Sequence, residues 1–264
     1  MKNILIKQNY YMIVSGVKVE HYSYSFYKKK GIGIEFDKEK LGNKVSRMFL
    51  EEQQKMIFEL LGDIKRKKIL DIGAGTGRLS ISLAKAGTIV TASDASNEML
   101  NLAKIKAKKE NVKIKFKIAN AHNLPFDNSE FDVVISIRTL MHVVNWRKVL
   151  AELCRVSKKD LIIDFPPKSG FAFSDPLFLG IKKIFVNNTQ NYKVFSIKEI
   201  KKELLKNNFI IIDIKKQYVL PLFLHRAVNS VFFSRAVEGF LRNLGLTYLF
   251  GAPILMKSRK IVYK

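Results

Sequence analysis

The stretch KKILDIGAGTGRLSISL, Lys67–Leu83, joins a short apolar run to three glycines and then to a segment with helical apolar spacing. Residues 69–72 predict a short buried strand, and the spacing of apolar residues over 79–84 predicts a helix. The glycines therefore occupy a strand-to-helix turn. Glycine lets a ligand approach the backbone closely at such a turn, so we expect a cofactor to bind there.

The same alternation of strand and helix continues along the chain. Further strands are predicted at residues 88–94, 112–119, 131–137, 160–165 and 209–219, and helices at 44–61, from Ser96, at about 145–156 and at 196–208. This order predicts an α/β fold with a parallel sheet and helices on both of its faces. In such sheets, ligands bind beyond the carboxyl ends of the strands, where the glycine turn lies.

The composition fits one large globular domain. The chain has 264 residues, of which 47% are hydrophobic and 6 are proline. No apolar run approaches the roughly 20 residues of a membrane span, and the first residues are too polar for a signal peptide. The single cysteine, Cys154, fits a reducing compartment and a packing role on its helix. We therefore expect a cytoplasmic protein, and we expect no metal site.

The chain is strongly basic. Its 47 Lys and Arg against 23 Asp and Glu give a net charge of +24. Such an excess can indicate an anionic partner, namely nucleic acid, a membrane surface or a phosphorylated substrate. It can also be a solvated lysine surface. Because the lysines are spread over several segments of the chain, we favour the solvated surface.

The glycine spacing excludes two nucleotide-binding motifs. Gly73, Gly75 and Gly77 follow one another at every second position, so the dinucleotide fingerprint G-x-G-x-x-G is not met. A phosphate-binding P-loop needs Gly-Lys-Ser/Thr, but Arg78 and Leu79 follow Gly77. The next strand ends at Asp94, whose carboxylate could accept both hydroxyls of a ribose.

At these residues the sequence resembles the class I S-adenosylmethionine-dependent methyltransferases, in particular the small-molecule branch that includes quinone-biosynthesis methyltransferases. The resemblance covers about residues 67–164 and is weaker towards the C-terminus. It implies a Rossmann-like seven-stranded, mostly parallel sheet and S-adenosyl-L-methionine as cofactor. It assigns these residues to cofactor binding: Asp71, Gly73, Ala74, Gly75, Gly77, Asp94, Ala95, Asn120, Ala121 and Ile137.

The segment ANAHNLPFDNSEFDVVIS, residues 119–136, resembles the family's adenine-side motif, but Asn120 replaces the usual acid. The side-chain oxygen of Asn120 can still accept a hydrogen bond from an adenine amino group, while Ala121 can offer its backbone N–H to a ring nitrogen. We expect a weaker contact than an acid would make, because hydrogen bonds to charged groups are the stronger ones. An ordinary turn asparagine is the alternative.

The segment SIRTLMHVVNW, residues 136–146, resembles the family's substrate-side segment. His142 occupies a position that is often histidine, and it could remove a proton from an acceptor hydroxyl. A packed histidine at a helix end is the alternative. The phrase DFPPKSG, from Asp164, departs from the motif of amino-group methyltransferases, so we interpret it as a loop. SKKD, residues 157–160, replaces the family's Pro-Gly-Gly turn before the strand.

Two segments outside the core could hold substrate. We expect residues 1–45 to form an N-terminal lid segment and residues 46–264 the methyltransferase domain, with insertions at about 166–195 and 218–251. The lid carries His21, Tyr22, Tyr24, Phe26 and Tyr27. In the second insertion we expect one amphipathic helix that covers the core, lies on an anionic membrane or roofs an apolar pocket. Its apolar face holds Val228, Val231, Phe232, Val237, Phe240, Leu241 and Leu244, and its other face Arg226, Arg235 and Arg242.

The sequence therefore predicts a methyltransferase that transfers a methyl group from S-adenosylmethionine to a small-molecule or lipid-like acceptor. An RNA or protein methyltransferase that uses the basic surface is the alternative, and a non-catalytic cofactor-binding protein is the third possibility. Peripheral membrane contact is compatible with the first. The sequence does not specify the acceptor atom or the oligomeric state.

Overall fold

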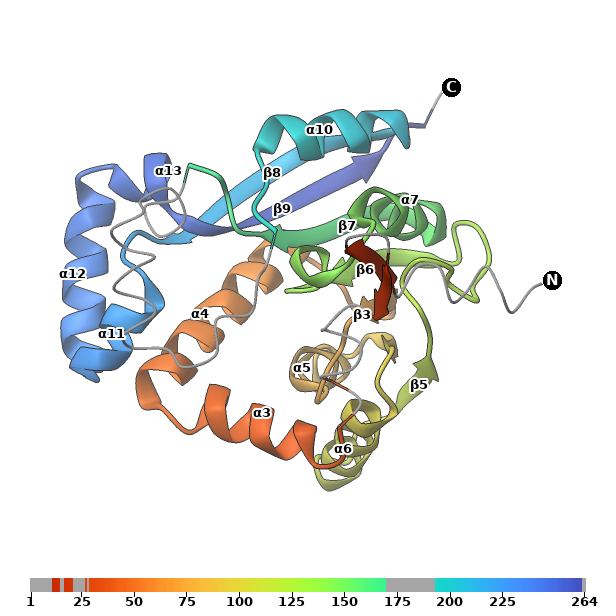
Figure 1. Cartoon of the computed structure of the whole chain (residues 1–264), viewed down its shortest axis with the longest axis horizontal. Coiled ribbons are helices and arrows are strands. Elements are labelled where there is room, and N and C mark those ends of the chain that lie inside the picture. The colour runs from red at the N-terminus through yellow and green to blue at the C-terminus, as the bar shows by residue number, and fades with distance from the viewer. Residues whose placement is uncertain (1–10, 15–16, 21–26, 28, 170–192, 263–264) are drawn as a thin grey trace.

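The structure is a computed structural model that describes residues 11–14, 17–20, 27, 29–169 and 193–262 (Figure 1). Its helices and strands are β1 (Tyr11–Val14), β2 (Val17–Glu20), α3 (Ile32–Leu41), α4 (Lys44–Leu61), β3 (Lys68–Ile72), α5 (Arg78–Lys85), β4 (Ile89–Asp94), α6 (Asn97–Lys109), β5 (Ile114–Ile118), β6 (Phe131–Ser136), the 3-10 turn η1 (Leu140–His142), α7 (Trp146–Val156), β7 (Ser157–Phe165), α10 (Ile197–Lys206), β8 (Phe209–Tyr218), α11 (Leu222–Val228), α12 (Val231–Asn243), α13 (Leu246–Phe250) and β9 (Ala252–Lys260).

One seven-stranded sheet organises the fold, in the order β5-β4-β3-β6-β7-β9-β8. The first five strands in this order are parallel, and β9 is antiparallel to both β7 and β8. This confirms the expected seven-stranded, mostly parallel α/β architecture. Because β9 runs in the opposite direction, β8 is parallel to the first five strands, so its carboxyl end lies at the same edge of the sheet as theirs.

Helices cover both faces of the sheet, as the alternating pattern predicts. On one face, α4 and α5 pack through Ile57, Leu60 and Leu83 against the strands. On the other face, α7 and α10 pack through residues such as Leu153 and Leu204. The buried side of α7 also contains Cys154, which confirms its packing role, and burial raises the pKa of its thiol to about 12.

Two elements differ from the sequence-based expectation. SKKD is not a turn, because Ser157–Phe165 is one continuous strand that follows α7 directly. The second insertion is not one amphipathic helix but the three helices α11, α12 and α13. The break lies at Asn229, whose backbone is left-handed with φ 50°. Val228 is therefore on a different helix from Phe232.

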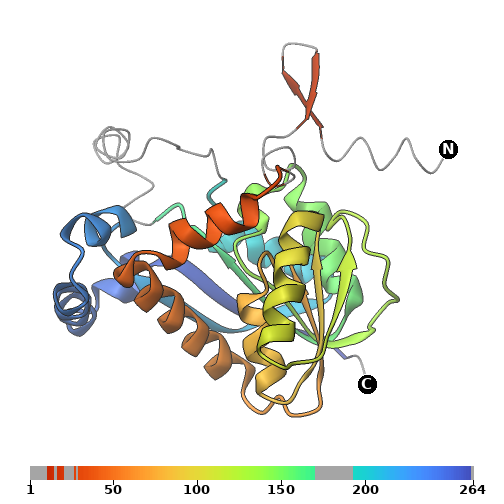
Figure 2. The same ribbon diagram turned by 90° about the horizontal axis from the view of Figure 1, so that it is seen from below.

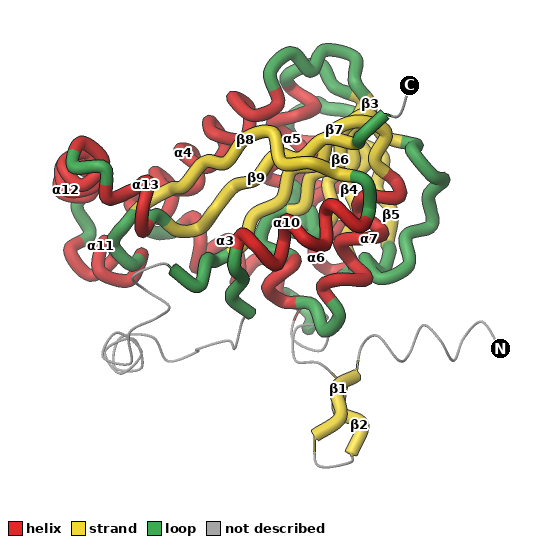
Figure 3. Tube along the Cα trace, turned by 90° about the horizontal axis from the view of Figure 1, so that it is seen from above, coloured by secondary structure: helices red, strands yellow, loops and turns green. Residues whose placement is uncertain are grey.

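Most of the first insertion and most of the aromatic lid residues lie outside the described residues. These are the residues 170–192 and His21, Tyr22, Tyr24 and Phe26. The described part of the N-terminal segment comprises the hairpin β1–β2, Tyr27, and α3 with the turn before it. Figure 2 shows α3 lying between α6 and the start of α4. Figure 3 shows β8 and β9 extending beyond the other strands towards α11, α12 and α13.

Candidate functional site

The glycine turn after β3 is fastened to the end of β4. The backbone N–H groups of Gly73 and Ala74 both donate to the carbonyl of Ser93, at 2.8 and 3.0 Å. Gly73 has a φ of 73°, and a Cβ atom there would lie 2.1 Å from Oγ1 of Thr139. The turn thus touches the segment after β6, and no larger residue fits at Gly73.

The other two glycines serve different purposes. A Cβ atom at Gly77 would lie 2.8 Å from Cβ of Ala103, so Gly77 lets α5 begin close to α6. A Cβ atom at Gly75 would meet nothing within 4 Å. Space is therefore open beside Gly75, at the carboxyl edge of the sheet where ligands of this fold class bind.

Asp94 ends β4 and faces this turn. Its carboxylate accepts the N–H of Gly75 and the N–H of Ser96, both at 2.9 Å. Ser96 caps α6 by accepting the N–H of Met99, as expected from the sequence. Burial raises the pKa of Asp94, and backbone N–H groups that include that of Ala95 oppose this shift. A carboxylate has about four acceptor positions, so Asp94 keeps capacity for further donors.

Asp71 lies inside the structure below the turn. Its side chain is only 3% exposed and accepts the hydroxyl of Ser80 on α5 at 2.6 Å. Burial raises the pKa of Asp71 to about 6. These contacts position α5 against β3. That Asp71 also contacts a cofactor stays a prediction.

Asn120 has a fixed amide orientation. Its Oδ1 accepts the backbone N–H of His122 at 3.0 Å and also contacts Nδ1 of the His122 ring at 3.0 Å. Because a backbone N–H can only donate, the oxygen must face His122. The Nδ2 atom of Asn120 is buried without a hydrogen-bond partner among the described residues. The oxygen that the sequence reasoning assigned to adenine is therefore already engaged, and the donor is left over.

The next two residues, Ala121 and His122, complete this side of the site. The ring of His122 is buried, and its Nε2 accepts the N–H of Asn145, the cap of α7, at 3.4 Å. His122 thus links the loop after β5 to α7. Within the described residues, the N–H of Ala121 donates no hydrogen bond. It remains able to contact a ring nitrogen.

The segment after β6 holds the remaining predicted residues. Oγ1 of Thr139 lies 3.3 Å from the carbonyl oxygens of Ile72 and Ile137, so it joins the ends of β3 and β6. His142 is half-buried in η1, and its N–H donates to the carbonyl of Thr139 at 2.9 Å. The structure therefore brings Ile137 and His142 to the edge that carries Gly73. The cofactor and catalytic roles of these residues stay predictions.

Helix α3 lies over the turn, and its contacts were not anticipated from the sequence. Asp37 accepts the hydroxyl of Thr76 at 2.7 Å and forms an ion pair with Lys106 of α6. Phe36 lies 5.4 Å from the guanidinium carbon of Arg138. Asp37 stands directly before KEK, residues 38–40, and nothing in this local sequence signals that its carboxylate will reach residue 76.

A charged cluster beside the turn was also missed. Asp164, at the end of β7, is buried and accepts the backbone N–H of Arg138 and the amide of Gln53. Burial raises the pKa of Asp164 to about 6. Arg138 has a left-handed backbone with φ 55°. Burial lowers the pKa of Arg78, and the positive charge of Arg138 adds to this shift. Asp164 and Phe165 thus belong to β7 and not to the predicted loop, and Asp164 holds the bend after β6.

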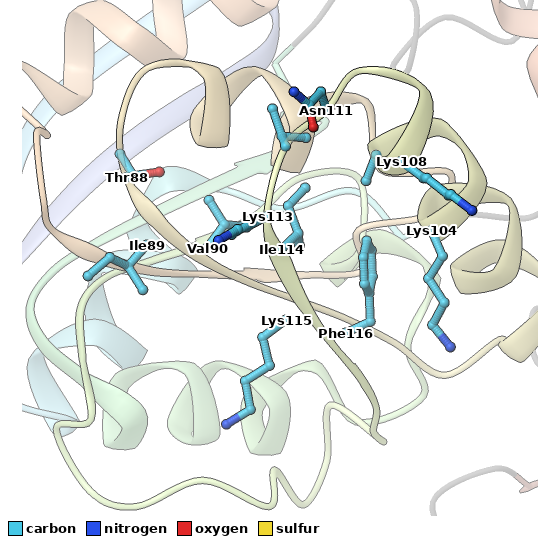
Figure 4. Close-up of a pocket in the computed structure, with 12 residues that line it drawn as sticks. Thr88, Ile89, Val90, Lys104, Lys108, Asn111, Lys113, Ile114, Lys115 and Phe116 are labelled. Carbon is cyan, nitrogen blue, oxygen red and sulfur yellow. The ribbon is translucent and has the colours of Figure 1, made fainter.

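A hollow between α6, β4 and β5 does not belong to this edge. It is lined near the amino ends of β4 and β5, by Ile89 and Ile114 among others, whereas the glycine turn follows carboxyl ends (Figure 4). Four lysines from two segments of the sequence meet around it: Lys104, Lys108, Lys113 and Lys115. The lysines are therefore less scattered in space than along the chain.

Three observations at the carboxyl edge fit a nucleoside with an amino-acid tail. Asp94 has acceptor capacity for ribose hydroxyls. Asn120 presents a buried donor without a partner, and the space beside Gly75 is open. The turn does not suit a pyrophosphate, because the N–H groups that would bind phosphate are already used: Gly75 donates to Asp94, and Gly73 and Ala74 donate to Ser93.

Comparisons with known proteins agree with this geometry. A family model described as a methyltransferase domain matches residues 69–160. The ubiquinone biosynthesis O-methyltransferase of Pelagibacter ubique is 35% identical over 100 residues, which cover 38% of this chain and 41% of that one. The demethylmenaquinone methyltransferase of Clavibacter sepedonicus is 41% identical over 92 residues, which cover 35% and 37%. Uncharacterised mycobacterial proteins match over 34% of their length, so the chain spans only about a third of these relatives.

Solved structures match over more of the chain. The magnesium protoporphyrin IX methyltransferase of Synechocystis, crystallised with bound S-adenosylhomocysteine, superimposes with a TM-score of 0.65 at 19% identity. The match covers 90% of this chain and 98% of that one. At this identity, the likeness establishes the fold. Residues 69–160 are thus similar to a methyltransferase domain, within a chain that has the fold of these solved methyltransferases.

Proposed function

We propose that this chain is an S-adenosylmethionine-dependent methyltransferase that methylates a small-molecule or lipid-like acceptor. The observation that carries the proposal is the carboxylate of Asp94. It is held by two backbone N–H groups at the end of β4 and keeps acceptor capacity next to the open side of Gly75.

The residues of the carboxyl edge divide the binding task. Asp94 would accept the ribose hydroxyls, and the turn from Gly73 to Gly77 would lie against the amino-acid part of the cofactor. Ala121 would donate to a ring nitrogen of the base, and the side chain of Asn120 would face the exocyclic group of the base. S-adenosylmethionine, when bound, supplies a methyl group on a positively charged sulfur.

The chain's contribution to catalysis is mainly alignment. Holding two reactants in line removes much of the entropic barrier to transfer, and the cofactor itself carries the reactive group. His142, on the segment after β6, would accept the proton of an acceptor hydroxyl. An acceptor whose nucleophile is already ionised or is a carbon would not need this base.

The small-molecule class is supported by two relatives that are named for quinone biosynthesis. Their matched regions contain the cofactor half of the fold and not the whole chain, so the acceptor of this protein is inferred as a class only. A further domain that would bind RNA is not found in the described residues.

Ligand-dependent melting tests the cofactor. We expect S-adenosylhomocysteine to raise the melting temperature of the full chain by mass action and NAD to have no effect. A rise with NAD and none with S-adenosylhomocysteine would refute the proposal.

Substitution of Asp94 tests the site. Asp94→Ala should weaken S-adenosylhomocysteine binding at least about tenfold, because charged hydrogen bonds of roughly 1.5–3 kcal/mol each are lost. Asp94→Asn keeps one acceptor oxygen, so its affinity for S-adenosylhomocysteine should lie between those of the wild type and of Asp94→Ala. The matched control is Asp132→Ala, since Asp132 accepts the N–H of Lys68 at the opposite end of β3, at 2.9 Å. Titration calorimetry with equal affinities for the Asp94 and Asp132 variants would remove Asp94 from the site.

A further inference from the structure

Helix α12 has its polar side inside and its apolar side outside. Ser234 and Glu238 are 0% and 5% exposed, whereas Phe232 and Phe240 are 83% and 61% exposed. A helix on the surface of a globular protein normally shows the opposite arrangement. The exposed phenylalanines therefore need a physical explanation.

The buried polar side is fully engaged and fixes the helix in this orientation. Both carboxylate oxygens of Glu238 accept backbone N–H groups, from Val219 at 2.8 Å and Leu220 at 2.9 Å. The buried ring of His225 lies between Glu238 and Ser234, at 3.0 and 3.1 Å. Rotating α12 to bury its phenylalanines would break these hydrogen bonds and leave buried polar groups unpaired, which is costly.

Seven large apolar side chains of this segment are exposed, and we name them together the α12–α13 patch. Its members lie on the end of α11, on α12 and α13 and just beyond α12: Val228, Phe232, Phe233, Phe240, Leu244, Tyr248 and Leu249, all between 43% and 83% exposed. Figures 1, 2 and 3 agree that α12 lies at the outer margin of the molecule. Large apolar side chains exposed together on one short segment mark an interaction site.

The exposed charges between residues 228 and 250 have one sign. Arg235 and Arg242 are exposed on one flank of α12, and the only acidic residue between positions 228 and 250 is the buried Glu238. The carboxylate of Glu52 on α4 also lies near these arginines: burial raises its pKa, and Arg242 and Arg235 oppose this shift. An apolar stripe flanked by arginines is complementary to a surface that is apolar within and anionic outside.

We propose that the α12–α13 patch docks the protein on an anionic lipid surface. A second copy of the chain is a poorer partner, because it would bring the same arginines and the same net charge of +24 against themselves. This docking does not require a membrane-spanning helix. Among the described helices, none is both long and apolar enough to cross a bilayer. The helices lie on the lipid surface instead.

Docking would orient the proposed active site. Helix α11 begins shortly after Tyr218, the carboxyl end of β8, and this end lies at the same edge of the sheet as the glycine turn. A lipid surface under the patch therefore lies beside the edge that Asp94 and Gly75 occupy. The docking inference itself does not rest on the proposed function, because its test needs neither cofactor nor acceptor.

Co-sedimentation with vesicles tests the apolar contribution. The full chain should bind vesicles of phosphatidylcholine with 30 mol% phosphatidylglycerol and should bind pure phosphatidylcholine weakly. Phe232→Glu and Phe240→Glu should each lower the partition coefficient about tenfold or more, because burying a phenylalanine is worth roughly 1.5–3 kcal/mol. The control is Ile105→Glu on α6, a side chain that is 66% exposed away from the patch. It should leave partitioning within about twofold of wild type.

Paired charge variants test the electrostatic contribution. Arg235→Glu with Arg242→Glu should reduce binding to the anionic vesicles by at least about tenfold, since each basic residue near such a surface is worth about 1 kcal/mol. Lys104→Glu with Lys108→Glu removes the same charge from the hollow in Figure 4 and should reduce binding far less. An equal loss in both pairs would assign binding to net charge alone and would overturn the proposal.

Two further results would overturn it. One is a stable dimer in sedimentation velocity that Phe232→Glu dissociates, without vesicle binding by the wild type. The other is tight, salt-dependent RNA binding in gel-shift titration without vesicle binding. Unchanged melting temperatures of the Phe232 and Phe240 variants show that a loss of binding does not come from unfolding, because both side chains lie on the surface.

Discussion

Two carboxylates of this molecule accept backbone N–H groups through both of their oxygens, and they serve different purposes. Asp94, at the glycine turn, accepts those of Gly75 and Ser96. Glu238, in α12, accepts those of Val219 and Leu220. Hydrogen bonding alone does not distinguish them.

The difference lies in what remains available on each carboxylate. Glu238 is 5% exposed, and its third partner is the buried ring of His225. Asp94 is partly exposed and borders the open side of Gly75. Glu238 therefore holds the α11–α13 segment in place, and Asp94 is available for a ligand. The two regions should respond differently to substitution.

The largest effect should come from removing the buried carboxylate. Glu238→Ala leaves two buried N–H groups and a histidine without their acceptor, and breaking such a buried charged network costs about 3–5 kcal/mol. We expect a loss of this size in the free energy of unfolding, measured with denaturant, and S-adenosylhomocysteine affinity within threefold of wild type. The control is Glu59→Ala, which removes an exposed ion pair with Lys215 on β8 and should change stability by less than about 1 kcal/mol.

This outcome would separate the two regions energetically. If Glu238→Ala weakened ligand binding as strongly as Asp94→Ala while the protein remained folded, the α11–α13 segment would be part of the binding site and the comparison would fail.

The next effect concerns the turn itself. Gly73→Ala should destabilise the protein by about 2–5 kcal/mol, because an alanine at positive φ costs about 1–2 kcal/mol and overpacking adds about 1–3 kcal/mol. The overlap is with Oγ1 of Thr139. Adding Thr139→Ala should therefore recover the overpacking part but not the backbone part. A double-mutant cycle without coupling would show that the two residues do not touch.

The sequence predicted the apolar architecture of the glycine-turn region well. Apolar periodicity located the helices at 44–61 and from Ser96, and the strands around the turn, because these residues pack on a sheet that is buried on both faces. The positions of Gly73 and Asp94 followed from the turn chemistry at the ends of two neighbouring strands.

The same reasoning failed where polar groups decide the packing. In α12 the apolar period was read correctly, but the helix buries Ser234 and Glu238 instead, since their hydrogen-bond partners come from residues 219, 220 and 225. Long-range partners such as Asp37 and Thr76 have no local signal either. Periodicity reports which residues share a face, and not which face turns inwards.

The substitution Asp71→Asn should have a smaller effect on stability, and it tests whether Asp71 has a structural role in the glycine-turn region. Burial in the folded protein raises the pKa of Asp71 from its ordinary value of 3.8 to about 6. Its ionised form, which predominates at pH 7, is therefore less stable in the folded than in the unfolded protein. Asp71→Asn keeps an acceptor for Ser80 and should raise the free energy of unfolding by about 2 kcal/mol at pH 7. The wild-type group takes up its proton as the pH falls through 6, so the wild type regains this stability and the difference should vanish near pH 4.

Denaturant unfolding from pH 4 to 8 measures this difference, and calorimetry with S-adenosylhomocysteine measures affinity in parallel. If Asp71 only positions α5, the variant should bind the ligand within about twofold of wild type. A large loss of affinity together with increased stability would instead place Asp71 in the binding site.

The smallest effect concerns Asn120, where the family pattern has an acid. Its oxygen is held by the N–H of His122, and its Nδ2 is a buried donor without a partner among the described residues. Asn120→Asp replaces this donor with an acceptor that can receive the adenine amino group. We expect S-adenosylhomocysteine to bind about three- to tenfold more tightly, since a neutral or partly charged hydrogen bond contributes roughly 1 kcal/mol.

S-inosylhomocysteine reverses the chemistry, because its base carries a carbonyl where adenine carries the amino group. The donor of Asn120 tolerates this carbonyl, whereas the carboxylate of Asn120→Asp would repel it, so the variant should bind the inosyl ligand more weakly than wild type does. The matched control is Asn123→Asp, an exposed residue three positions along the same loop. If that variant improved S-adenosylhomocysteine binding equally, the gain would come from added negative charge near the site rather than from a hydrogen bond at position 120.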